Sequence, residues 1–159
     1  MIIIGIDPGK KGGIALIGEG KISFPSSGGL LYSKWYDLTD WVNAAKMLDG
    51  EAEDVVAYVE LVHSMPNQGV ASTFSFGKGF GEVLGWLGAL KVRAELVSPQ
   101  KWKRAVLAGT DRDKAAAIRF VQENYPDIDL TPGRCRVPQD GIADAVCIAH
   151  YGMLQEMKK

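Results

Sequence analysis

The segment Ile2 to Ile6 holds four isoleucines and one glycine, and the turn sequence Asp7-Pro8-Gly9 follows it directly. A short run of β-branched residues that ends at Pro and Gly is typical of a buried strand that meets a turn. A buried strand needs other elements to cover it, so the order of the remaining segments decides which fold is open to the chain.

Further segments along the chain have either the short apolar runs of strands or the apolar spacing of helices. The predicted strands are 2–6, 14–17, 21–24, 55–59 and 93–97, and the predicted helices are 35–48, 69–90, 99–107, 111–124 and 139–157. An antiparallel meander followed by strands joined through helices predicts an α/β chain with a five-stranded mixed sheet flanked by helices. This order suits a ribonuclease-H-like fold. No repeat or linker interrupts it, so residues 1–159 are expected to form one domain.

The composition is that of an ordinary globular protein, with 47% apolar residues, 23% charged residues and a net charge of −1. The first residues are apolar over too short a stretch for a signal peptide, and no segment has the length and apolar character of a membrane span. Cys135 and Cys147 have no metal-ligand spacing and are expected to be free thiols in a reducing compartment. The sequence therefore favours a cytosolic protein.

Basic residues gather in one stretch although the total charge is near zero. Between positions 101 and 114 only two acidic residues accompany five basic ones: Lys101, Lys103, Arg104, Arg112 and Lys114. Such side chains are by default solvated charges on helices, but their density also fits contacts with the phosphates of a nucleic acid. Trp102, in the same stretch, either packs beneath the basic helix or faces a DNA base, and packing is favoured.

Two carboxylates stand at the ends of predicted strands. Asp7 follows the strand 2–6, and Glu60 follows the strand 55–59. An aspartate at such a position often only shapes a turn, but the carboxyl ends of strands are also where α/β sheets place functional residues. If the two strands are neighbours, the two carboxylates lie side by side, and a divalent cation would hold them together against their repulsion.

A second pair of carboxylates, Asp140 and Asp144, is four positions apart and so shares one face of the last predicted helix. Complementation of the helix dipole would explain Asp140 but explains Asp144 less well. Four carboxylates without a histidine or thiolate partner suit a hard cation, so Mg²⁺ is expected, and Mn²⁺ as its substitute. Two such ions can activate a water and stabilise the leaving oxygen when a phosphodiester is cleaved.

Taken in their order along the chain, the motifs resemble those of the RuvC family of Holliday junction resolvases. IDPG with Asp7 looks like the first catalytic motif, VE with Glu60 like the second, and DGIADAVCIAHYG, with Asp140 and Asp144, like the C-terminal catalytic helix. The stretches SPQKWKRAVLAG and DRDKAAAI resemble the region of the DNA-contacting lysines. The segment MPNQGVASTFSFGKGFGEVLGWLGAL and the tripeptide WKR are similar to phage-encoded members of the family.

The resemblance implies a homodimer that cuts two strands of a four-way DNA junction with the help of Mg²⁺, without a nucleotide cofactor or a membrane. It implies that Asp7, Glu60, Asp140 and Asp144 are the catalytic metal ligands. The residues expected to contact the branched DNA are Lys10, Lys11, His63, Lys101, Lys103, Arg104 and Lys114.

Two departures from the bacterial members accompany this resemblance. Those members commonly space the last two acids by three residues, where this chain has Gly141, and its spacing is similar to that of phage and mitochondrial members. They also carry an aromatic residue soon after the glutamate, whereas this chain has His63 there, with Phe74 and Phe76 later. A strict preference for one cleavage sequence is therefore not predicted.

Three other functions stay open. A less selective nuclease that cuts flaps, forks and three-way junctions would use the same fold and site. A non-catalytic protein that binds branched DNA is the second, and the complete acidic set argues against it. In the third, the Asp-Pro-Gly turn would bind a nucleotide phosphate as in sugar kinases and actin-like ATPases, but those folds need two such domains and this chain has room for one.

A row of glycines marks the predicted helix 69–90. Gly77, Gly81, Gly85 and Gly88 recur near one face of it. Glycine in a helix interior costs about 1 kcal/mol per residue, so the row needs a reason. Close approach of another backbone is the usual one, and either the sheet or a second subunit would supply it. The dimeric habit of the family favours the second subunit.

Overall fold

The computed structural model describes residues 1–9, 11–18, 21–23, 55–63, 69–110, 113 and 115–159. The strands described are β1 (Ile2–Asp7), β2 (Gly13–Gly18), β3 (Lys21–Ser23), β4 (Val55–Glu60) and β5 (Arg93–Val97). The helices described are α2 (Val70–Ala89), α3 (Pro99–Val106), α4 (Ala116–Asn124) and α5 (Asp140–Glu156). The predicted helix over 35–48 lies outside the described residues.

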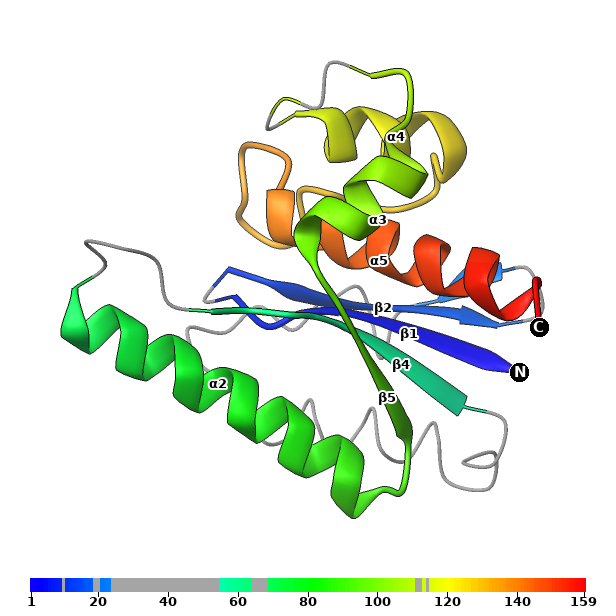
Figure 1. Ribbon diagram of the computed structural model, residues 1–159. Helices are drawn as coiled ribbons and strands as arrows, with labels where there is room; N and C mark the ends of the chain where they lie inside the picture. Colours follow the sequence, from blue (N-terminus) through cyan, green and yellow to red (C-terminus); the bar gives the residue numbers. More distant parts are fainter. Residues whose placement is uncertain (10, 19–20, 24–54, 64–68, 111–112, 114) are drawn as a thin grey trace.

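The sheet is mixed and has helices on both faces. In the strand order β3-β2-β1-β4-β5, β1 runs antiparallel to β2 and parallel to β4, and β4 runs parallel to β5. Helix α2 covers one face, whereas α5 lies on the other with α3 and α4 beyond it (Figure 1). This arrangement confirms the predicted α/β sheet flanked by helices. None of the described helices has the length and apolar character needed to cross a membrane.

Alternation along β1 and β4 divides the buried side chains into two cores. Ile3, Val56 and Tyr58 belong to the core beneath α5, whereas Ile4 and Ile6 belong to the core on the α2 side. Because side chains on one face recur at every second residue, the acidic residues that end both strands fall on the α5 face. The same alternation that builds the core therefore directs these two carboxylates toward α5.

Helix α5 packs so closely on the sheet that its backbone contacts the backbone of β1. A Cβ atom added to Gly5 would lie 2.2 Å from the carbonyl oxygen of Ala145, and one added to Gly141 would lie 1.9 Å from that of Lys11. Atoms in a close-packed interior do not approach so closely, so glycine is required at both positions. The helix is buried on most of its surface because α3 and α4 pack on the side that the sheet leaves open.

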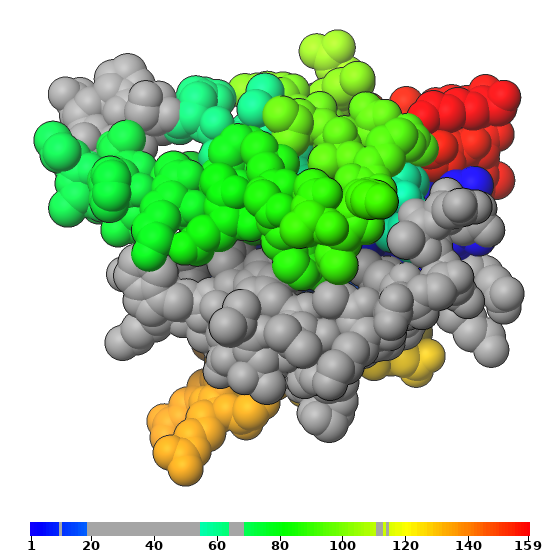
Figure 2. Space-filling view, turned by 90° about the horizontal axis from the view of Figure 1, so that it is seen from below, coloured from blue at the N-terminus to red at the C-terminus, as the bar shows by residue number. Residues whose placement is uncertain are grey.

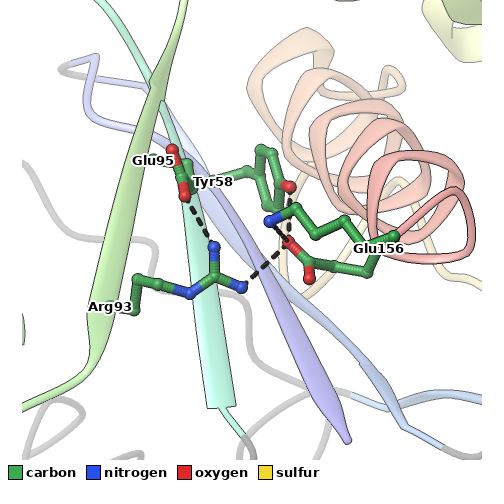
Figure 3. A network of polar contacts seen from close by, with 5 residues as sticks. Tyr58, Arg93, Glu95 and Glu156 are labelled. Atoms are coloured by element: carbon green, nitrogen blue, oxygen red, sulfur yellow. Dashed lines mark hydrogen bonds and ion pairs between the residues drawn. The ribbon is translucent and has the colours of Figure 1, made fainter.

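One carboxylate ties the C-terminal end of α5 to the sheet (Figure 3). Oε1 of Glu156 accepts hydrogen bonds from the Tyr58 hydroxyl at 2.7 Å, from Arg93 at 2.9 Å and from Lys159 at 2.9 Å. Arg93 also pairs with Glu95 at 2.6 Å. Burial alone would raise the pKa of Glu156, but the hydrogen bonds outweigh it and lower this pKa to about 2.

Helix α4 is shorter than predicted. The apolar spacing predicted 111–124, whereas the described helix begins at Ala116. The carboxylate of Asp113 accepts hydrogen bonds from the backbone N–H of Ala115 and from Arg119, both at 3.0 Å. Such local bonds compete with helix formation, which accounts for the later start. The other predicted limits within the described residues differ from the observed ones by one residue at most.

The four glycines of α2 (Gly77, Gly81, Gly85 and Gly88) face away from the sheet. All are exposed, and a Cβ atom added at any of them would meet no described atom within 4 Å. Figure 2 shows α2, in green, at the surface of the molecule. Packing of this row against the sheet is therefore wrong as an explanation of the glycines, and contact with a second subunit stays a prediction.

Replacing Gly5 with alanine is expected to lower the free energy of unfolding by about 3 kcal/mol, because the added methyl group meets backbone atoms of α5. Gly18→Ala, at the end of β2, is the matched control. A Cβ atom there would meet only the side chain of Ile2 at 3.8 Å, so this change should be neutral or stabilise by up to about 1 kcal/mol. Urea denaturation followed by circular dichroism measures both, and equal effects would contradict the close contact between α5 and β1.

The hydrogen bonds of Glu156 predict stability that is lost in acid. The pKa of this carboxyl is about 2 in the folded chain against an ordinary value of 4.5, so its contribution is complete above the ordinary value and disappears as the pH falls toward 2. Glu156→Gln should therefore lower the Tm at neutral pH, and the difference from wild type should shrink near pH 3. A difference in Tm that is the same at both pH values would show that the charge of Glu156 does not stabilise the fold.

Candidate metal and nucleic-acid site

Asp7 and Glu60 lie next to each other where their strands end. β1 and β4 are parallel neighbours with Ile6 opposite Val59, so the two acidic residues that follow are the next pair in this register. The condition under which the two carboxylates lie side by side, that their strands are neighbours, is thus met. Oδ1 of Asp7 also accepts a hydrogen bond from the backbone N–H of Gly9 at 2.9 Å. The turn that follows β1 therefore fixes the direction of the Asp7 carboxylate.

Helix α5 brings the other two acidic residues to this end of the sheet. Its first turn lies against the turn after β1, where Gly141 approaches the backbone of Lys11 and Gly12. Asp140, the first residue of the helix, is exposed, and Asp144 is partly buried. A side chain at position 141 would overlap the Lys11 carbonyl, so an acid on this turn fits at 140 and not at 141. Backbone packing thus accounts for the spacing of four.

The four carboxylates repel one another. Burial, then the charge of Glu60, then those of Asp144 and Asp140 raise the pKa of Asp7 to about 7. Burial also raises the pKa of Asp144 to about 6, and Lys103 opposes this rise while Glu60 and Asp140 add to it. Such a cluster costs folding free energy, which is why groups with strongly raised pKa values are associated with functional sites.

The donor chemistry of the cluster fits a hard divalent cation. The four side chains offer carboxylate oxygens alone, which suit Mg²⁺ or Mn²⁺ and not zinc. As the side chains lie, no three acidic, histidine or cysteine groups within the described ranges are arranged to hold a metal ion. Like charges favour separated carboxylates, and the pKa of Asp7 is raised by burial and then by neighbouring negative charges that a divalent cation would offset.

Trp102 contacts this site, whereas its sequence context favoured packing beneath the basic helix over contact with a DNA base. The packing is confirmed, because the side chain is 0% exposed. In addition, its indole Nε1–H donates a hydrogen bond to Oε1 of Glu60 at 2.9 Å. Nζ of Lys103 lies 5.0 Å from the centroid of the indole ring, within the range of a cation–π contact. Helix α3 therefore reaches the carboxylates through an aromatic and a basic side chain.

Of the described residues that were predicted to contact DNA, three lie on α3, which packs on α5, and the other two follow β1 and β4. The described ones are exposed or partly exposed: Lys11, His63, Lys101, Lys103 and Arg104. Lys103 is close enough to Asp144 to lower the pKa of that carboxyl. Lys10 and Lys114 lie outside the described residues.

The loop that precedes α5 carries two arginines that the sequence patterns did not single out. Arg134 and Arg136 are exposed, and neither has an ion pair within the part of the chain that the structure describes. This segment projects from the molecule in Figure 2, in orange. A hydrogen bond from the Gln139 N–H to the Leu130 carbonyl, at 2.8 Å, joins its two ends. Two basic residues shortly before the aspartates of α5 are the sequence pattern that could have indicated this loop.

The remaining reactive side chains have structural roles. Cys135 and Cys147 are free thiols, as predicted. His150 is partly buried, and its Nδ1 shares a hydrogen bond with the hydroxyl of Tyr125. Burial lowers the pKa of His150. His150 thus takes part in the packing of α5 against α4, where its ring lies beside Phe120 and Tyr125.

The fold is shared with solved structures of RuvC from Thermus thermophilus. T. thermophilus RuvC in complex with Holliday junction substrate gives a TM-score of 0.63 at 19% sequence identity, with 99% of this chain and 96% of that chain covered. A second T. thermophilus RuvC structure gives a TM-score of 0.56 at 20% identity, with 99% and 97% covered. No family model and no curated protein matches the chain. The chain therefore has the ribonuclease-H-like fold of RuvC.

Asp7→Asn is expected to stabilise the chain by about 1–3 kcal/mol in EDTA at pH 8. The folded-state pKa of Asp7 is about 7 against an ordinary value of 3.8, so the folded chain loses stability as the pH rises between these values. An amide of the same shape avoids this loss. Thermal unfolding measures the change.

Asp127→Asn, on an exposed turn, is the control and should change stability by less than about 0.5 kcal/mol. Mg²⁺ should raise the Tm of wild type and of this control, but raise that of Asp7→Asn much less. A lower stability of Asp7→Asn in EDTA would show that the cluster does not strain the fold.

Proposed function

We propose that this chain is a Mg²⁺-dependent endonuclease that resolves Holliday junctions by hydrolysing phosphodiester bonds. The observation behind this function is the convergence of Asp7 and Glu60 with Asp140 and Asp144 at one end of the sheet, close enough for the neighbouring charges to add to the raised pKa values of Asp7 and Asp144. RuvC of T. thermophilus, which has the same fold, is solved in complex with a Holliday junction substrate. Because a fold alone does not define a function, the acidic cluster is the stronger support.

Asp7, Glu60, Asp140 and Asp144 would hold the divalent ions, and four carboxylates suit two of them. Bound Mg²⁺ supplies a water of lowered pKa and offsets charge on the phosphodiester and on the leaving oxygen. The chain itself holds the four acidic residues on strands and on a buried helix, so their backbone positions are set before the DNA arrives. Lys103, beside Asp144, adds positive charge where a phosphate would lie.

Basic side chains near the carboxylates fit the DNA backbone. A chain with a net charge of −1 binds DNA through local segregation of its charges. Helix α3 carries Lys101, Lys103 and Arg104, and the loop before α5 carries Arg134 and Arg136. Phosphate contacts position a protein on DNA without reading its sequence, which agrees with recognition of a branched shape.

A homodimer belongs to this proposal, because cutting two strands of one junction needs two equivalent sites. The glycine side of α2 also carries Val70 and Phe74, whose exposed fractions are 87% and 74%. Apolar residues that continue a row of glycines along one face allow two helices to pack closely. We assign the dimer contact to this face. Its segment is also part of the resemblance to phage-encoded members, so the proposal includes that branch and the cytoplasm of a host cell.

Labelled four-way, three-way, flap and linear DNA in Mg²⁺ test the activity. Wild type should cut the four-way junction in two strands at symmetric positions. Asp7→Asn should cut at least roughly 10³-fold more slowly and bind the junction as wild type does, because the substitution removes a metal ligand and no phosphate contact. Asp127→Asn should cut at the wild-type rate.

Two results would redirect this function. Similar cleavage rates on flaps, three-way and four-way forms would favour the broader structure-specific nuclease. Tight junction binding without cleavage in either Mg²⁺ or Mn²⁺ would leave the non-catalytic branched-DNA-binding protein.

A further inference from the structure

We infer that Trp102 is a positioning residue that orients Glu60 for metal binding, an inference that rests on the proposed function. The indole Nε1–H donates to Oε1 of Glu60 at 2.9 Å, and the donor belongs to a side chain that is 0% exposed. The two residues are far apart in the sequence and come from different elements, α3 and β4. Their contact is therefore set by the tertiary fold.

The surroundings of the indole make this hydrogen bond persistent. The ring is part of the core beneath α5, so its position is fixed by packing on several sides. Water does not compete with the bond at the buried ring, and a buried donor left without an acceptor would destabilise the fold. An apolar side chain such as phenylalanine would fill the core without that requirement. The indole N–H thus adds a directional constraint that core packing does not need.

The bond leaves Glu60 suited to a cation. Its Oε1 accepts the indole N–H, and no described residue donates a hydrogen bond to its Oε2. A neutral donor fixes the plane of the carboxylate and leaves its negative charge in place, whereas a salt bridge would neutralise that charge. Outer hydrogen-bond partners of metal ligands typically change metal affinity or activity by about 10–100-fold.

Helix α3 also links this bond to the proposed DNA contacts. Lys103 follows Trp102 in the chain, and its Nζ lies 5.0 Å from the indole centroid. The residue that would bind a phosphate, Lys103, is therefore the neighbour in the chain of the residue that orients Glu60. Binding of DNA and orientation of the metal ligand thus share one short helical segment.

Trp102→Phe tests the inference, because it keeps an aromatic ring in the core and removes the N–H donor. The full chain should bind Mn²⁺ about 10–100-fold more weakly by calorimetry and need correspondingly more Mg²⁺ for half-maximal cleavage. Junction affinity should stay within about threefold of wild type, since no phosphate contact is removed. Trp86→Phe, on the α2 side of the sheet, is the matched control and should leave metal affinity unchanged.

A spectroscopic measurement separates orientation of Glu60 from mere packing. In a ¹H–¹⁵N spectrum, the indole signal that Trp102→Phe removes should shift when Mg²⁺ is added to wild type, and Glu60→Gln should abolish this response. If Trp102→Phe does not fold, the signal of Trp102 can be assigned as the indole signal that Glu60→Gln shifts most. The response of that signal to Mg²⁺ then tests whether Trp102 senses metal binding at Glu60.

The role of Trp102 would be overturned if Trp102→Phe bound Mn²⁺ as tightly as wild type. It would also be overturned if the indole signal did not shift on addition of Mg²⁺. A wild-type chain that binds Mn²⁺ and shows the indole response but cuts no DNA would refute the proposed nuclease and leave the role of Trp102 in metal binding intact.

Discussion

The close contact between α5 and the first hairpin is the constraint on which the rest of the molecule depends. Gly5 and Gly141 let the helix reach the backbone of β1 and of the turn after it, with no side chain between. This distance places the acidic turn of α5 over the carboxyl ends of β1 and β4. A helix held further away by one layer of side chains would cover the same core but would not bring its aspartates to Asp7 and Glu60.

The same helix meets opposite electrostatic conditions at its two ends. At the N-terminal end, burial and repulsion raise the pKa values of Asp7 and Asp144, which costs folding free energy. At the other end, the donors around Glu156 lower its pKa and stabilise the contact with β4 and β5. The buried middle of the helix joins the two. The fold thus offsets a strained site with packing and with one satisfied carboxylate.

Local patterns were enough to predict the parts of the site that each strand or helix carries by itself. A β-branched run that ends in an acid predicted both strands, and the adjacency of Asp7 and Glu60 followed on the condition that these strands are neighbours. Contacts between distant segments had no such pattern. The bond from Trp102 to Glu60 depends on how α3 packs, and the need for Gly141 depends on the Lys11 carbonyl. The sequence left two explanations for the glycines of α2, contact with the sheet or with a second subunit, and only the fold showed that they face away from the sheet.

The seating of α5 on β1 also bears on the order in which the chain is made. The two elements that must touch lie at opposite ends of the described sequence, so β1 leaves the ribosome long before the helix that covers it. Contacts between segments so far apart in the sequence form late in folding. Until they form, the uncovered apolar strand is prone to associate with other chains. A chain broken off before α5 would hold Asp7 and Glu60 but neither aspartate of the helix. Incomplete copies would therefore lack the full acidic cluster.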